Sequence, residues 1–98
     1  MVTYVLSGKP KAGKANEATK WAKDEAKRVE KIAKTHIAVM TQRFSDNPRI
    51  YWVINFESLA ALEAWEKKVR ANKAHNESVR KAFTSILEDG AGALFQEV

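Results

Sequence analysis

The sequence predicts an α+β fold of the ferredoxin-like class, with the order β-α-β-β-α-β, a four-stranded antiparallel sheet and a second helical unit broken in two. Three observations lead to this prediction: alternating apolar segments near both ends, an alanine-rich helical pattern after the first of them, and a strand hairpin before a second helical region. In such a fold the helices cover one face of the sheet and leave the other bare. At 98 residues, we expect one domain spanning 1–98.

The first half of the chain predicts a strand, a helix and a hairpin. Residues 2–7 alternate as a strand with one buried face does. Across residues 11–34, small apolar residues recur every three or four positions, which predicts a helix with an alanine stripe toward the sheet. The β-rich runs 37–44 and 49–56 are joined by Ser, Asp, Asn and Pro, which favour a turn.

The second half predicts two helical stretches and a closing strand. Ser58 is a natural N-cap for the first stretch. A break follows near Asn72, and Asn76 can cap the second stretch, which we expect Gly90 to end. Residues 93–98 then form the last strand.

The run 49–56 has one fully apolar face and one mixed face, the latter formed by Arg49, Tyr51, Val53 and Asn55. We expect the mixed face on the bare side of the sheet. Fully buried apolar side chains contribute about 1.5–3 kcal/mol each, so leaving several in water would forgo considerable stability. A second copy packed sheet to sheet would recover it, and we therefore expect a homodimer.

Net charge is +5, and residues 9–34 carry the whole excess, with nine Lys or Arg against four Asp or Glu. Such a stripe can attract nucleic acid. Its lysines alternate with acidic residues, however, and no aromatic residue lies among them on the polar side for base stacking. We therefore expect a solvated helix face and no nucleic-acid partner.

The absence of cysteine excludes disulfides and a thiolate nucleophile, and it favours a reducing compartment. No apolar run approaches the roughly 20 residues of a membrane span. We expect a cytoplasmic protein with no membrane partner.

The chain resembles the dimeric α/β-barrel superfamily, in particular the antibiotic-biosynthesis-monooxygenase-like domains, at Asn47-Pro48, Phe56-Glu57-Ser58, Leu62, Trp65, His75 and Arg80. The resemblance implies a homodimer with facing sheets and a cavity between sheet and helices in each subunit. Activities in that superfamily include cofactor-independent oxygenation of phenols, haem binding and degradation, and isomerisation.

The resemblance also implies candidate site residues. In the haem-degrading branch a Trp and a His ten residues later form the pocket, and Trp65 and His75 keep that spacing. The first-strand Asn of that branch is replaced by Leu6 or Ser7. We expect no cofactor, with haem as the alternative. Further pocket candidates are Trp52, Tyr51, Asn55, Glu25 and Trp21.

Two of these candidates have competing interpretations. His75 is either a ligand or general base, which its imidazole chemistry allows, or a cap or surface residue at a helix junction. Glu25 is the one carboxylate on the apolar side of its helix, where it could face the pocket. Arg28, three residues later, could instead draw it outward, and we favour the exposed boundary.

We therefore expect a homodimer that binds a small apolar or aromatic molecule and could act as a cofactor-independent oxygenase. The alternatives are a non-catalytic dimer and a haem-binding relative. Residues 8–15 fit G-x-x-x-x-G-K, but Ala15 stands where a phosphate-binding loop needs Ser or Thr, so phosphate or looser anion binding there is a less favoured alternative. His36 has no second ligand at suitable spacing, and we expect no metal site.

Overall fold

The computed structural model describes residues 1–96, and within them the elements follow the predicted order. They are β1 (Val2–Pro10), α1 (Ala15–Ala33), β2 (Ala38–Thr41), β3 (Ile50–Phe56), α2 (Leu59–Arg70), α3 (Lys73–Ser85) and β4 (Leu87–Gln96). The strands form one antiparallel sheet in the order β2-β3-β1-β4. The predicted ferredoxin-like class is therefore confirmed.

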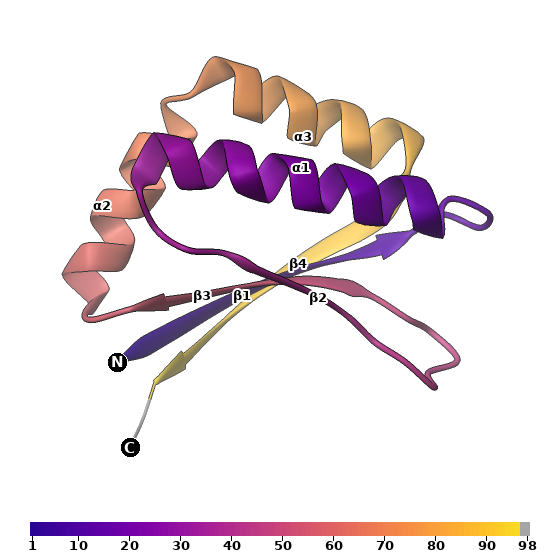
Figure 1. Cartoon of the computed structure of the whole chain (residues 1–98), viewed down its shortest axis with the longest axis horizontal. Helices are drawn as coiled ribbons and strands as arrows, with labels where there is room; N and C mark the ends of the chain where they lie inside the picture. Colours follow the sequence, from indigo (N-terminus) through magenta and orange to yellow (C-terminus); the bar gives the residue numbers. More distant parts are fainter. Residues whose placement is uncertain (97–98) are drawn as a thin grey trace.

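The helices cover one face of the sheet. In Figure 1, α1 and α3 run side by side above the strands and α2 lies at one end. The alanine stripe of α1 is buried as predicted, and so is the apolar face of β3; together they comprise Ala18, Ala22, Ala26, Ile50, Trp52, Ile54 and Phe56. Small side chains on α1 leave room for the large ones on β3.

The second helical unit is capped differently from the prediction. Ser58 caps α2 as expected, and its Oγ accepts a hydrogen bond from the Ala61 N–H at 3.2 Å. The expectation that Asn76 caps α3 is wrong, because Asn72 has extended backbone and its side chain accepts from the His75 N–H at 2.9 Å. The helix therefore starts earlier, and His75 lies in its first turn.

Several predicted boundaries also move. β1 continues to Pro10 because β4 pairs with it along that length, and Gly90 lies within β4, opposite Gly8, rather than ending α3. Helix α1 begins at Ala15, after a turn in which Gly13 has φ +74°. The last two positions of the predicted final strand lie outside the described residues.

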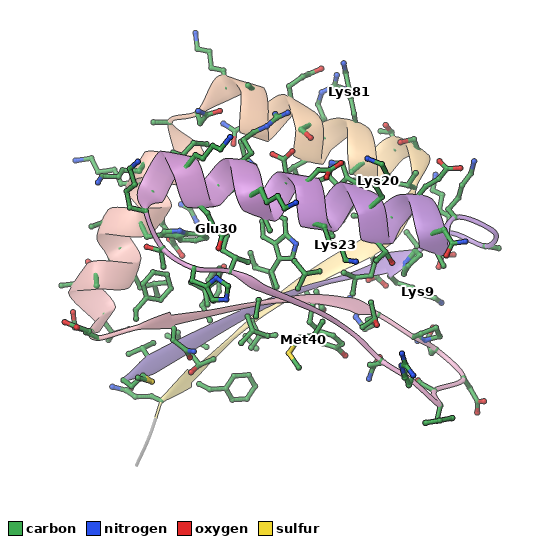
Figure 2. The ribbon with its side chains drawn as sticks, in the orientation of Figure 1. Lys9, Lys20, Lys23, Glu30, Met40 and Lys81 are labelled. Carbon is green, nitrogen blue, oxygen red and sulfur yellow. The ribbon has the colours of Figure 1, made fainter. Side chains whose placement is uncertain are left out.

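The face of the sheet away from the helices is uncovered in the single chain. It carries Met40 and Phe95, which are 56% and 59% exposed, beside half-buried Val5, Tyr51 and Val53. Figure 2 shows Met40 on the side opposite the helices. The predicted position of the mixed face of β3 is confirmed.

The outer surface of α1 is a solvated charged face. Lys20 and Lys23 project from it in Figure 2, and Lys20 pairs with Asp24 at 2.9 Å. None of the helices in the described part of the chain combines the length and apolar character needed to cross a membrane.

Candidate functional site

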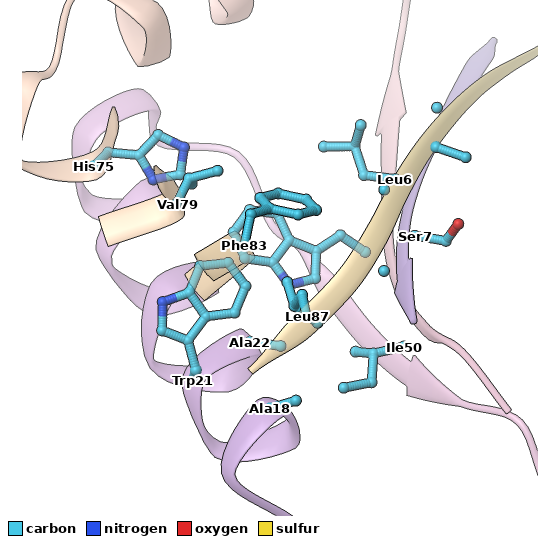
Figure 3. Close-up of a pocket in the computed structure, with 15 residues that line it drawn as sticks. Leu6, Ser7, Ala18, Trp21, Ala22, Ile50, His75, Val79, Phe83 and Leu87 are labelled. Atoms are coloured by element: carbon cyan, nitrogen blue, oxygen red, sulfur yellow. The ribbon is translucent and has the colours of Figure 1, made fainter. Parts of the chain in front are cut away.

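A cavity of about 460 Å³ lies between the sheet and helices α1 and α3. This volume is typical of small-molecule sites. The lining shown in Figure 3 consists of Leu6, Ser7, Gly8, Ala18, Trp21, Ala22, Ile50, Trp52, His75, Val79, Phe83, Leu87, Gly90, Ala91 and Gly92. Among these described residues, His75 alone carries an ionisable side chain.

Missing side chains create much of this space. Ala18 and Ala22 keep the α1 wall low, and glycines at alternate positions of β4 keep the β4 wall low. A Cβ atom at Gly90 would lie 2.6 Å from Cζ of Phe83. The Phe83 ring therefore lies directly against the strand, at the edge of the cavity.

Three aromatic rings line one wall. Trp21 and Trp52 are stacked with centroids 6.1 Å apart and planes at 15°, and Trp52 and His75 have centroids 6.3 Å apart at 30°. These separations fall within the range of favourable aromatic pairs. The wall offers a flat apolar surface next to an imidazole.

Behind this wall, His75 contacts a buried carboxylate. Its Nδ1 lies 2.6 Å from Oε2 of Glu25, and the two residues are 8% and 2% exposed. An ionised carboxylate only accepts hydrogen bonds, so we assign the ring proton to Nδ1. The expectation that Glu25 lies at the exposed boundary is wrong: α3 covers this side of α1 and supplies its partners.

The second oxygen of Glu25 belongs to the same network. Its Oε1 accepts from Ser78 Oγ at 2.8 Å, and Ser78 Oγ accepts in turn from Trp21 Nε1 at 3.0 Å. The Arg28 Nε lies 3.7 Å from the same oxygen, although its side chain is 48% exposed. Helix α1 thus holds the carboxylate and α3 supplies the imidazole and the hydroxyl.

A smaller cavity of about 140 Å³ adjoins the first. Its lining includes Trp52 and His75, which also line the larger one, together with Tyr4 and Trp65. The Trp65 Nε1 is buried without a hydrogen-bond partner among the described residues. Burial, assisted by the negative charge of Glu66, raises the pKa of the Tyr4 hydroxyl, so this phenol stays neutral.

The structure thus brings together five of the seven candidate site residues. Trp21, Trp52 and His75 line the larger cavity, Trp65 lines the smaller one, and Glu25 supports His75.

The other two candidates, Tyr51 and Asn55, line neither cavity. Strand alternation places them on the uncovered face, where the Thr3 hydroxyl donates to Asn55 Oδ1 at 2.7 Å. In the single chain they are therefore separated from the cavity by the sheet itself.

Sequence reasoning missed Ser78, Tyr4 and Phe83 as parts of the site. Ser78 had a usable signal, because residues three apart on a helix are neighbours and it follows His75 by three. Tyr4 and Phe83 carried no signal beyond their apolar character.

The three lysines of residues 8–15, which span the end of β1 and the loop before α1, all have polar partners. Lys11 Nζ donates to the Thr84 carbonyl, Lys14 pairs with Glu17, and Lys9 pairs with Glu88.

Within residues 1–96, no group of three His, Asp or Glu side chains is placed to hold a metal ion.

Together the fold and cavity define a ferredoxin-like α+β domain with a small-molecule-sized site between sheet and helices. Solved structures of this class resemble it closely. An antibiotic biosynthesis monooxygenase superimposes with a TM-score of 0.68 at 12% identity, covering 100% of this chain and 99% of its own. No curated protein matches the chain.

The chain belongs to the NIPSNAP family, whose sequence model matches residues 3–90. An uncharacterised NIPSNAP domain protein from Burkholderia xenovorans has a TM-score of 0.81 at 14% identity, covering 100% of this chain and 95% of its own. A NIPSNAP family protein from Agrobacterium tumefaciens has a TM-score of 0.79 at 11% identity, covering 99% and 92%. The resemblance to monooxygenase-like domains thus holds at the level of fold, and the family itself is NIPSNAP.

Proposed function

We propose that this protein binds a flat, largely apolar small molecule in the larger cavity. The observation that carries the proposal is a cavity of about 460 Å³ whose wall contains the stacked rings of Trp21 and Trp52. Among the described residues that line it, His75 alone is ionisable. A planar ligand would stack on this wall and present a polar group to His75. A strongly charged ligand would find no Lys or Arg in the described lining.

Calorimetric titration with a panel of flat bicyclic and tricyclic compounds, including 2-naphthol, tests this proposal. Val79→Phe fills the cavity from α3 and should abolish the binding heat. Leu59→Phe adds the same ring at a position on α2 that is 43% exposed and should leave binding unchanged. No binding heat across the panel, or equal affinity in both variants, would rule out the cavity as the site.

A cofactor-independent oxygenase is the more specific form of this proposal. Its support is the monooxygenase-like fold together with an aromatic pocket, and fold alone is weak support for chemistry. Oxygen consumption in the presence of each ligand that binds would reveal the activity. Binding without oxygen uptake would favour a non-catalytic ligand-binding protein.

Haem is not favoured by these residues. His75 could serve as an axial ligand, but the described lining of the larger cavity has no Lys or Arg to pair with two propionates. The smaller cavity is lined by Arg70. The guanidinium of Arg70 already pairs with the Glu66 carboxylate, with Nη2 lying 3.4 Å from Oε2, so Glu66 would compete with a propionate for it. The residues of the two cavities therefore do not fit haem.

We further propose that two copies pack through their uncovered sheet faces. The support is the row of apolar side chains there, including Met40, Val53 and Phe95. Native mass spectrometry should show a dimer, and Val53→Lys should shift it to monomer because a charge would be buried at the centre of the interface. Lys20→Glu, on the opposite side of the molecule, is the control. A wild-type monomer at micromolar concentration would contradict the assembly.

Location in the cytoplasm stays a prediction.

A further inference from the structure

The buried Glu25–His75 pair calls for an explanation beyond stability. Burying a charged group is unfavourable unless it is paired, and well-packed apolar residues often replace buried ion pairs without loss of stability. The chain has a second Glu–His contact, between Glu30 and His36 at 2.9 Å, in which the His side chain is 85% exposed. In the first pair, His75 instead lines a cavity, where it can meet a ligand, and Glu25 lies behind it.

The orientation of His75 leaves one nitrogen for that ligand. Because Nδ1 is held by Glu25, Nε2 lies on the far side of the ring, and no hydrogen bond to it is found from the described residues. Figure 3 shows the ring beside Val79 at the cavity edge, with one nitrogen directed toward the interior. With the proton on Nδ1, the lone pair of Nε2 is free to accept a proton.

We propose that His75 is a general base and that Glu25 is its positioning residue. The substrate class is a flat carbonyl compound with an acidic C–H next to the carbonyl. The C–H bond breaks, the proton moves to Nε2, and the bonding electron pair forms the enolate. Return of the proton to carbon or oxygen completes a tautomerisation that needs no oxidant. This inference rests on the proposed binding of a flat ligand in the same site.

The experiment uses 2-tetralone, a flat bicyclic ketone, as the probe. Proton NMR in deuterated buffer follows exchange of the hydrogens next to the carbonyl, and calorimetry measures binding of the same compound. The wild-type protein should accelerate exchange over buffer, and His75→Ala should reduce the protein-dependent rate about 100-fold or more, the usual contribution of general-base catalysis. Added imidazole should restore part of the rate in His75→Ala, which a purely structural role would not allow.

The positioning residue has its own readout. Glu25→Gln should lower the exchange rate while leaving the affinity for 2-tetralone within about twofold, since the carboxylate does not touch the ligand. His36→Gln, which alters the exposed Glu–His contact, is the matched control and should behave as wild type. Circular dichroism of each variant verifies the fold.

The outcomes separate this inference from the proposed function. Binding of 2-tetralone without accelerated exchange, or exchange that survives His75→Ala in a folded protein, would overturn the general-base assignment and leave ligand binding intact. Absence of both binding and exchange would overturn both. Accelerated exchange that is lost in His75→Ala and recovered with imidazole would support the assignment.

Discussion

Replacing Glu25 by Ala should destabilise the protein by about 2–4 kcal/mol. The substitution removes the acceptor of two hydrogen bonds, from His75 Nδ1 at 2.6 Å and from Ser78 Oγ at 2.8 Å. Each donor left unsatisfied costs about 1–3 kcal/mol when buried. The half-exposed Arg28 adds little, because exposed ion pairs contribute about 0–1 kcal/mol. Relief of the buried charge offsets part of the loss, which sets the lower bound.

Urea unfolding followed by tryptophan fluorescence measures this free energy. Protein concentration must be held fixed, since dimerisation would make stability depend on it. Glu63→Ala, at an exposed position on α2, is the matched control and should change stability by less than about 0.5 kcal/mol. The double variant with His75→Ala should lose less than the sum of the single losses, by about 0.5–3 kcal/mol.

Two results would refute this reasoning. If Glu25→Ala is as stable as the control, then the carboxylate is not held by the network. If the Glu25 and His75 substitutions are strictly additive, the two side chains are not coupled, and the general-base assignment loses its structural basis.

Three further predictions test other parts of the structure. Gly90→Ala places a methyl group against the Phe83 ring, which is 40% exposed and can turn outward. Urea titration should therefore show a loss of unfolding free energy below about 1 kcal/mol. Calorimetry should show altered affinity for 2-naphthol, and unchanged affinity would contradict ligand contact at β4. Ser58→Ala removes the N-cap of α2 and should cost about 1 kcal/mol in thermal or urea unfolding, whereas Ser58→Asp should retain the cap. The pKa of the Glu30 carboxyl is lowered, chiefly by the hydrogen bond from the Ile37 N–H. The ionised carboxylate therefore stabilises the folded state, and Glu30→Gln should be less stable than wild type near neutral pH. That difference should shrink as pH falls through the lowered pKa, and a gap that stays constant during acid titration would exclude this cause.

The fold was accessible from sequence because its signals are local. The alternation in β3 and the alanine stripe of α1 each follow from the period of one element. The start of α3 was less accessible: Asn72 and Asn76 both have cap chemistry, and the packing of the finished helix decides between them. Glycine within β4 likewise indicates a turn from sequence, whereas pairing with β1 makes it part of a strand.

The candidate site was accessible only in part. Helical position showed that Glu25 lies near the apolar side of α1, but its burial depends on partners about fifty residues later in the chain. The break between α2 and α3 turns His75 back toward α1, and no local pattern specifies that angle. Trp52 was identified by its strand face, and the same alternation separates Tyr51 from the cavity.

The glycines that line the cavity suggest how ligand size could differ among related chains. At Gly8, Gly90 and Gly92 the sheet presents backbone where other strands present side chains. A relative that acquires a methyl or larger group at one of these positions would accommodate a shorter ligand while keeping its core and its Glu–His pair. Selectivity for molecular length could therefore evolve on β1 and β4, independently of the chemistry held by α1 and α3.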